Sequence, residues 1–298
     1  MPTNEQRRAT AKRKLERQLE RRAERDRKRR TYTIIGSAVA AVVVIAAVVA
    51  TIVLTNRDSG TPTASTPTAA STSDAASPLD APEPGKPGAL PPFAAPAGLG
   101  SNCQYAKSPE PASKPVEPPR AGKVPTDPAT VSASMETNQG NLGLELDNAK
   151  SPCTVNSFAS LANKGFFDNT PCHRLTTGEG LAVLQCGDPT GQGTGGPGYQ
   201  FANEYPTDQY QPDDPKLQQP VVYPRGTLAM ANAGPGTNGS QFFLVYKDST
   251  LPPNYTVFGT IDQTGLATLD KIAAAGTKDG GEDGAPKLDV TIKQLQLD

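Results

Sequence analysis

Residues 231–246 read ANAGPGTNGSQFFLVY, and two kinds of sequence meet within this stretch. The first ten residues are small, glycine-rich or amide-bearing, which is typical of an exposed loop. They run without a break into FFLV at 242–245, which is typical of a buried strand. The stretch raises the question of why a loop should end in a hydrophobic wall.

Alternating apolar residues indicate that the chain after residue 130 is built from short strands. They flank the turn sequence NQGN, with Val131, Ala133 and Met135 before it and Leu142, Leu144 and Leu146 after it. This spacing predicts an antiparallel hairpin with one buried face. Further strands are expected at CHRL, AVLQ, TLAM, QFFLVY, YTVFGTI and LDVTIKQLQL. In the last of these the apolar phase changes between Ile292 and Leu295, which predicts a β-bulge near Gln294.

Two segments have helical periodicity. The first can begin with Ser151 as its cap and Pro152 at its first position, and Gly165 is its expected stop; the second precedes Gly276. Their apolar faces consist of Val155, Phe158 and Leu161 in the first segment and Leu266, Leu269 and Ile272 in the second. Many short strands with two helices predict a mainly-β fold, a closed barrel capped by helices.

The first 54 residues have the pattern of a membrane anchor. Residues 1–30 contain thirteen Lys or Arg and five acids, and residues 34–54 form an uncharged apolar run of 21 residues. As a helix this run would span about 31 Å, the thickness of a bilayer core. We expect a transmembrane helix at 34–54 rather than a signal peptide, whose apolar region is only about 7–15 residues long. The basic segment 1–33 should stay cytoplasmic, which places the rest of the chain outside the cell membrane.

Residues 55–125 are rich in Pro, Ser, Thr and Ala. They contain half of the prolines of the chain and only scattered apolar residues, so the segment cannot bury enough surface to fold alone. We expect a disordered linker that holds a domain at 126–298 away from the membrane. All four cysteines, Cys103, Cys153, Cys172 and Cys186, lie on the exported side, which suggests disulfides with three possible pairings.

The sequence lacks the usual motifs of hydrolytic and metal chemistry. It contains one histidine, no G-x-S-x-G, no H-E-x-x-H and no cluster at metal-ligand spacing, so we expect no metal and no cofactor. GQGTGG at 191–196 satisfies G-x-G-x-x-G, but Pro197 and Gly198 follow at once and prevent the helix that a phosphate site needs. His173 is interpreted as a packed or surface residue, and Arg174, on spacing alone, as exposed or ion-paired.

Five motifs together resemble the cyclophilins in order and spacing. They are CHRL with Arg174, LQCGD with Gln185, GTGGPGY at 193–199, ANAGPGTNGSQFF at 231–243 and VFG at 257–259. The fourth is highly specific, because its thirteen consecutive positions agree almost completely with the family pattern. The resemblance covers residues 131–297, and the segments before it resemble those of the membrane-anchored members of the family.

The resemblance implies an eight-stranded antiparallel closed barrel with two helices, and isomerisation of the peptide bond before proline. It implies that Arg174 donates to the prolyl nitrogen and that Gln185 helps to hold the substrate and the arginine. The substrate-binding residues that it implies are Ala182, Val183, Gly193, Ala231, Asn232, Ala233, Gln241, Phe243, Leu251 and Tyr255. The loop and the wall of residues 231–246 are then two halves of one peptide groove, whose partners are proline-containing polypeptides.

Two positions depart from the family pattern. Ala182 stands where most cyclophilins have a phenylalanine, and Thr250 stands where many have the tryptophan that binds cyclosporin. We therefore expect a shallower pocket and only weak cyclosporin binding, because Thr250 lacks the area and the N–H donor of an indole.

The hairpin with Arg174 and Gln185 also motivates a hypothesis for the cysteines. Cys172 and Cys186 flank this hairpin, so we expect them to pair, which leaves Cys103 to pair with Cys153.

Two other function classes remain as alternatives. A binding module could grip proline segments without turnover, but Arg174 and Gln185 favour an enzyme, since binding alone needs neither. Nucleic-acid binding through the basic segment would require the apolar span beside it to be ignored.

Overall fold

Residues 87–298 are the part of the chain that the computed structural model describes. The expected basic segment 1–33, the expected transmembrane helix 34–54 and the first part of the expected linker, 55–86, lie outside the described residues. Within residues 87–298, no helix combines the length and the apolar character needed to cross a bilayer.

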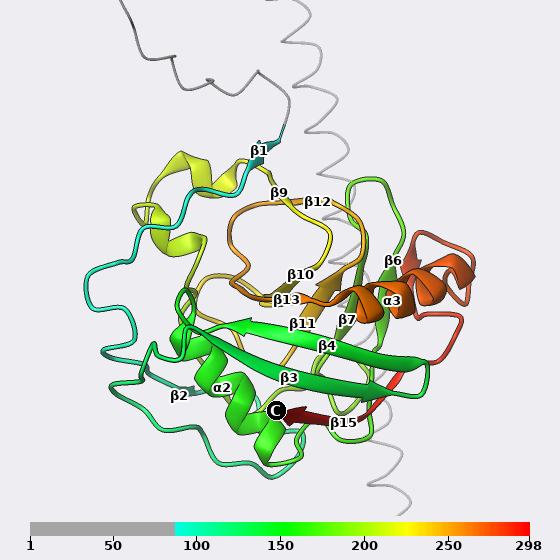
Figure 1. Cartoon of the computed structure of the whole chain (residues 1–298), viewed down its shortest axis with the longest axis horizontal. Coiled ribbons are helices and arrows are strands. Elements are labelled where there is room, and N and C mark those ends of the chain that lie inside the picture. Colours follow the sequence, from blue (N-terminus) through cyan, green and yellow to red (C-terminus); the bar gives the residue numbers. More distant parts are fainter. Residues whose placement is uncertain (1–86) are drawn as a thin grey trace, which may run out of the picture. The chain divides into compact units, whose positions relative to one another are not determined.

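An antiparallel sheet forms the body of the domain (Figure 1). Its strand order is β14-β6-β7-β11-β10-β13-β4-β3-β15-β5. The bounds of these strands are β3 Thr130–Thr137, β4 Gly140–Asp147, β5 Thr170–Pro171, β6 Arg174–Thr176, β7 Val183–Cys186, β10 Thr227–Met230, β11 Phe242–Val245, β13 Val257–Ile261, β14 Asp283–Gly284 and β15 Thr291–Leu297. Two smaller sheets consist of β1 Gly88–Ala89, β9 Val221–Tyr223 and β12 Ser249–Leu251, and of β2 Ala106–Lys107 and β8 Tyr199–Gln200.

The main sheet curls, and the short segment 170–176 connects its two sides. β5 pairs with β15, whereas β6 pairs with β7 and β14. Between them, the N–H of Cys172 donates to the carbonyl of Val290, and the N–H of His173 donates to the carbonyl of Gln185. Within the described residues the sheet is a ten-stranded ladder that ends at β14 and β5. The expected closed barrel of eight strands is thus found as a curled antiparallel sheet of ten strands, in which segment 170–176 links β15 to β7.

The expected hairpin, β-bulge and helices are confirmed. β3 pairs with β4 along its whole length, and the register of β15 shifts between Ile292 and Gln294. α2 spans Pro152–Asn163 and packs against β15 and β4, and α3 spans Gln263–Ala275 and packs against β4. The short 3-10 helices are η1 Thr207–Gln209 and η2 Pro215–Gln218.

The two faces of the sheet carry two separate hydrophobic clusters. Phe242 belongs to the larger one, the interior cluster, where its ring packs edge-on against Phe158 at 5.3 Å and Phe167 at 5.7 Å. Phe243 belongs to a second cluster, which also contains Val183 and other residues of the opposite face. Successive side chains of a strand point to opposite faces, so the wall in residues 231–246 has one core side and one outer side.

Residues 87–125, here called the N-terminal arm, pack on the domain. β1 pairs in parallel with β9 (Figure 1). β2 pairs with β8, and Cys103 is disulfide-bonded to Cys153 at the start of α2. The expectation that a disordered linker extends to residue 125 is therefore wrong for the arm. Scattered apolar residues cannot form a core of their own, but they can bury surface against a domain that supplies the rest of the core.

The N-terminus of α2 is capped by a carboxylate from a distant segment. Ser151 occupies the N-cap position, but its hydroxyl donates to the carbonyl of Val257 at 2.8 Å and makes no capping bond. Instead the buried carboxylate of Glu204 accepts from the N–H groups of Cys153 at 2.9 Å and Thr154 at 2.8 Å, and from the Thr154 hydroxyl at 2.7 Å. Burial raises the pKa of Glu204 to about 7, although these three donors act in the opposite direction.

We expect Glu204 to make the domain less stable as the pH rises from mildly acidic to neutral. Its pKa is raised from 4.5 to about 7, so between these values the folded state keeps a proton that the unfolded state has released. The stability associated with that proton is fully present below pH 4.5 and is lost as the pH approaches 7, a change of roughly 3 kcal/mol. Glu204→Gln should remove this part of the pH dependence of the unfolding free energy.

Denaturant unfolding at about pH 5 and pH 8 measures the effect. Glu179→Gln serves as the control, because Glu179 is exposed on a turn and should leave the wild-type dependence intact. Asp208, whose charge contributes to the raised pKa of Glu204, is kept in both variants. The same pH dependence in Glu204→Gln as in the wild type would contradict the assignment.

Candidate functional site

Strand register places the candidate catalytic residues in one row. Arg174 on β6 is opposite Gln185 on β7, Gln185 is opposite Phe243 on β11, and Phe243 is opposite Ala229 on β10. Residues directly opposite each other share a face of the sheet, so this row lies on the face away from the interior cluster. Neighbouring strands are about 4.8 Å apart, which separates the backbones of Arg174 and Phe243 by two strand spacings.

A cluster of apolar side chains surrounds Phe243 and is here called the pocket. Its ring packs edge-on against Tyr255 at 5.7 Å, and Val183, Leu251 and Ala231 belong to or pack against the same cluster. Of the residues expected to bind substrate, the structure thus brings Val183, Ala231, Phe243, Leu251 and Tyr255 together. These apolar groups can form a socket for a ring of similar character.

Tyr223 supports the pocket and was not identified from the sequence. Its side chain is fully buried, and its hydroxyl donates to the carbonyls of Pro252 at 3.2 Å and Tyr255 at 3.1 Å. These bonds hold the turn that positions the ring of Tyr255. A tyrosine in the run VVYP offers no sequence signal for this role.

Ala182 and Thr250 do not face the pocket. Ala182 is 1% exposed and belongs to the interior cluster. This corrects the expectation that Ala182 binds substrate, because alternation along the strand puts Val183 and Gln185 on the pocket face and Ala182 on the other. Thr250 lies between Ser249 and Leu251 on β12, and the same alternation turns its side chain away from the cluster that Leu251 contacts.

A chain of hydrogen bonds runs through the polar part of the site. Arg174 Nη1 donates to Gln185 Oε1 at 3.2 Å, and Gln185 Nε2 donates to Gln241 Oε1 at 2.9 Å. Gln241 Nε2 then donates to the carbonyls of Gly193 and Gly195, both at 3.0 Å. A guanidinium can only donate, so the first bond orients the amide of Gln185 and each amide orients the next. Arg174, Gln185, Gln241 and Gly193, all expected site residues, are therefore connected.

Arg174 is also held by a carboxylate that the sequence analysis missed. Its Nε and Nη2 donate to Oδ1 and Oδ2 of Asp283, both at 2.7 Å. The hydrogen bond with Asp283 raises the pKa of Arg174, and the same contact lowers the pKa of Asp283. Asp283 lies on β14, in a run of glycines and acids that carries no motif. Only the pairing of β14 with β6 reveals its role.

The glycine-rich loop 191–196 folds around the carboxylate of Asp188. The backbone N–H groups that donate to this buried carboxylate, at 2.8 to 3.2 Å, are those of Thr190, Gln192, Thr194 and Gly195. Burial acts to raise the pKa of Asp188, but these donors outweigh it and hold the pKa below its ordinary value. The loop with the G-x-G-x-x-G pattern therefore binds an anion, and this anion is the carboxylate of Asp188. The match was the signal that could have identified Asp188.

The segment 231–233 is partly occupied by internal hydrogen bonds. The N–H of Ala231 donates to the carbonyl of Gln241 at 3.0 Å, and the N–H of Ala233 donates to Thr237 Oγ1 at 2.9 Å. The side-chain amide of Asn232 donates to the carbonyl of Asn254 at 2.8 Å. Among the described residues, the groups of this segment left for a peptide are its carbonyls and the N–H of Asn232.

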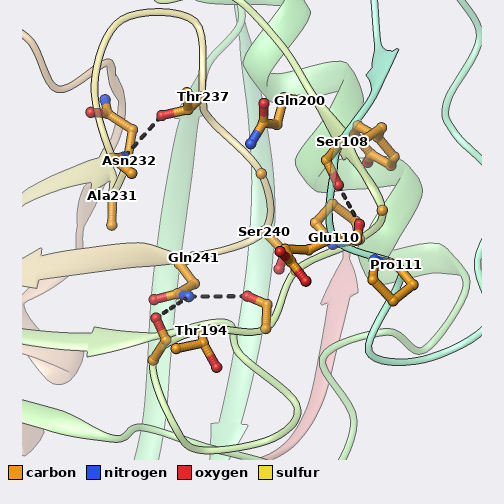
Figure 2. Close-up of a pocket in the computed structure, with 18 of the residues that line it drawn as sticks. Ser108, Glu110, Pro111, Thr194, Gln200, Ala231, Asn232, Thr237, Ser240 and Gln241 are labelled. Carbon is orange, nitrogen blue, oxygen red and sulfur yellow. Dashed lines mark hydrogen bonds between the residues drawn. The ribbon is translucent and has the colours of Figure 1, made fainter. Parts of the chain in front are cut away.

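An open groove of about 690 Å³ extends from this polar chain. Figure 2 shows Asn232 and Thr237 on one side, Ser108, Glu110 and Pro111 of the arm on the other, and Gln241 and Thr194 in the lower part of the view. The remaining lining comes from Gln185 and from segments 193–200 and 231–241. Gln185 belongs both to the groove and to the row, and Ala231 both to the groove and to the pocket, so the groove adjoins the pocket.

Both disulfides have the pairing hypothesised from the sequence. Cys172 is bonded to Cys186, and Cys103 is bonded to Cys153. The first bond ties the residues that flank β6 and β7 and braces the hairpin that carries Arg174 and Gln185.

The assembled groups are suited to binding rather than to proton transfer. They provide a cation, amides, backbone carbonyls and an apolar wall. His173 is half-buried, its Nδ1 has no partner among the described residues, and burial lowers its pKa. Within residues 87–298, no cluster of three His, Cys, Asp or Glu residues is placed to hold a metal ion.

Comparisons with known proteins identify a family. The family model for "Cyclophilin type peptidyl-prolyl cis-trans isomerase/CLD" matches residues 132–297. "Probable peptidyl-prolyl cis-trans isomerase B" of Mycobacterium leprae is 73% identical over 209 residues, which cover 70% of this chain and 71% of that protein. The protein of the same name from Mycobacterium tuberculosis is 71% identical over 209 residues, covering 70% and 68%.

A crystal structure of a cyclophilin type peptidyl-prolyl cis-trans isomerase from Cryptosporidium parvum is similar with a TM-score of 0.45 and 30% identity, over 57% of this chain and 98% of that one. The match to the mycobacterial proteins also extends into the N-terminal arm, because 209 residues are more than the 167 positions from 132 to 298.

We expect Asp283→Asn to slow the cis–trans exchange of a proline peptide through kcat, with little change in KM. Asparagine keeps one acceptor but loses the charge and the second acceptor, so the guanidinium of Arg174 is less well oriented. A loss of about 1 kcal/mol, typical of a partly exposed ion pair, corresponds to a roughly fivefold lower kcat. NMR exchange spectroscopy on the full-length protein measures both constants.

Asp279→Asn is the matched control. Asp279 lies in the same loop and is exposed, but it accepts from the N–H of Gly281 at 3.2 Å and makes no hydrogen bond or ion pair with Arg174. Its substitution should leave kcat unchanged. Equal effects of the two substitutions would show that the loop as a whole, and not the Asp283 carboxylate, affects the rate.

Proposed function

The chain belongs to the cyclophilin-type peptidyl-prolyl cis–trans isomerase family, and from this premise we propose that Arg174 and the pocket around Phe243 perform the isomerisation. In this proposal the proline ring of a bound polypeptide occupies the pocket, and the guanidinium of Arg174 meets the prolyl nitrogen. Gln185 holds the arginine, and the carbonyls of segment 231–233 receive the extended peptide.

The chemistry of the reaction fits a site whose groups bind the substrate rather than transfer protons. The barrier to rotation about the peptide bond, about 20 kcal/mol, comes from the loss of amide resonance. No proton needs to be transferred and no covalent intermediate is needed. A catalyst has only to bind the twisted amide better than the planar one. As the bond twists, the lone pair localises on the prolyl nitrogen and becomes a hydrogen-bond acceptor.

Arg174 has the donors that this step requires. A guanidinium carries five N–H groups, and three of its nitrogens already make one bond each, two to Asp283 and one to Gln185. Two N–H groups, one on each terminal nitrogen, therefore remain for the substrate. The bidentate contact with Asp283 fixes the plane of the guanidinium, so these donors are oriented before the substrate arrives.

The observation that best supports the proposal is the single row of Arg174, Gln185 and Phe243 across three strands. The row puts the donor about two strand spacings from the floor of the apolar pocket, which suits a proline whose ring is buried and whose nitrogen faces the arginine. A binding module that grips proline without turnover would need the pocket but not an oriented donor.

We further propose that residues 34–54 anchor the protein in the cell membrane, with residues 55–298 on the extracytoplasmic side. The apolar run and the basic segment before it support this orientation. The two disulfides of the described residues also support it, because such bonds persist in oxidising compartments. The polypeptides served would then be exported proteins that fold outside the membrane.

We expect Arg174→Ala to lower kcat roughly a hundredfold, because a charge-assisted bond made mainly to the twisted state contributes about 3 kcal/mol. Peptide affinity should change far less. Arg174→Lys should restore only part of the rate, since an ammonium cannot hold the planar, forked contact with Asp283. The full-length protein and a peptide with a single proline suffice for NMR exchange measurements.

Arg225→Ala is the matched control for this substitution. Arg225 makes a bidentate contact with Asp270 at 2.7 and 2.8 Å. This ion pair is about as exposed as the pair of Arg174 with Asp283. Its loss should affect stability but not exchange. If the wild type binds the peptide without accelerating its exchange, the binding-module interpretation is correct. If Arg174→Ala loses binding, exchange and folding together, the arginine is structural.

For the membrane orientation, protease added to intact cells should remove residues after Leu54 and spare the basic segment. Mass spectrometry of the cell-bound and released fragments measures this. A mature N-terminus near Thr55 on a soluble exported product would instead establish a cleaved signal peptide.

A further inference from the structure

The N-terminal arm forms one wall of the substrate groove. Ser108, Glu110 and Pro111 line it, and Figure 2 shows them across from Asn232 and Thr237. These three residues lie outside the range 132–297 that the family model matches. The wall is therefore formed by a part of this chain that the family model does not include.

The arm is fixed beside the groove by several independent bonds. β2 pairs with β8, whose residues Tyr199 and Gln200 line the groove from the other strand. The N–H of Ser108 donates to the carbonyl of Gly198 at 3.0 Å, and the N–H of Ser113 donates to the carbonyl of Gly196 at 2.8 Å. The Cys103–Cys153 disulfide holds the preceding part of the arm on α2. The arm is thus held in place beside the groove by the strand pairing, the backbone hydrogen bonds and the disulfide.

The wall is continuous with the place where the proline is expected to bind. Gln241 and Gln185 line the groove and belong to the hydrogen-bond chain of Arg174. Ala231 lines the groove and packs against the pocket around Phe243. An extended peptide advances about 3.3 Å per residue, so a peptide with its proline in the pocket would place a residue only a few positions away in the groove.

The charge of the groove comes from the arm. Among the groove-lining residues, the ionisable side chains are those of Glu110 and of Tyr199, which is buried. The carboxylate of Glu110 makes no ion pair or hydrogen bond among the described residues. The other lining groups are glycines, amides, hydroxyls and proline rings. A free carboxylate beside a polar groove favours a cationic side chain, because nothing else in the groove compensates its charge.

We propose that the arm is a specificity element and that Glu110 selects polypeptides carrying Lys or Arg within a few residues of the isomerised proline. This rests on the proposed function for the position of the proline, and it adds a preference that the family site alone does not contain. A basic flank would be attracted by Glu110, and an acidic flank would be repelled.

The test uses the full-length protein and peptides of equal length that contain one proline. Lys, Gln or Glu is placed in turn at each of the three positions on either side of the proline, and kcat/KM is measured by NMR exchange at low ionic strength. At one or more positions the wild type should prefer Lys over Glu by about fivefold, as expected for a solvent-exposed charge pair. About 1 M salt should reduce this ratio to near one.

Glu110→Gln should abolish the preference, and Glu110→Lys should invert it, with each Lys-to-Glu ratio measured within one variant. Glu117→Gln is the matched control, because Glu117 is an exposed residue of the same arm that does not line the groove. It should keep the full preference. An unchanged Lys-to-Glu ratio in Glu110→Gln, or a wild-type ratio of one at every position, would overturn the proposal.

The dissociation constants of the same peptides give a second readout. If no peptide shows accelerated exchange, the proposed function fails, but the Lys-to-Glu ratio of the dissociation constants in the wild type and in Glu110→Gln still decides the role of Glu110.

Discussion

The two-residue period of β11 is the constraint on which the rest of the site depends. Phe242 and Phe243 are neighbours in sequence, yet one packs among the rings of the interior and the other forms the floor of the pocket. A slip of β11 by one residue would turn each of its side chains to the other face, and because all four are buried, both clusters would have to repack. Core packing therefore fixes the register of β11 against β7.

The fixed register carries the polar groups with it. Once Gln185 is opposite Phe243, the pairing of β6 with β7 puts Arg174 at the end of the same row. The geometry of the site is thus held by burial on the other face of the same strands. This arrangement leaves the substrate face free for polar and partly exposed groups that contribute little to stability.

Two carboxylates define the ends of the polar network. Asp283 holds Arg174 at one end, and Asp188 organises the glycine-rich loop whose carbonyls receive Gln241 at the other. Between these two carboxylates, the side-chain amides of Gln185 and Gln241 each have one orientation in which the oxygen accepts from one neighbour and the nitrogen donates to the next. A site of this kind is prepared before substrate binds, which is what a reaction without proton transfer requires of its catalyst.

The sequence by itself determined the strands, the two helices, the bulge in β15 and the family, because side-chain periodicity and a specific motif of thirteen residues are local properties of the chain. It also identified Arg174, Gln185 and most of the pocket through the resemblance to the family. The tertiary structure decided what local pattern cannot contain: Asp283 beside Arg174, Glu204 as the cap of α2, Ala182 in the interior, and the arm as a wall of the groove. Each of these depends on which distant segments meet, and an isolated acid or a proline-rich run looks the same in sequence whether or not a partner surface lies beside it.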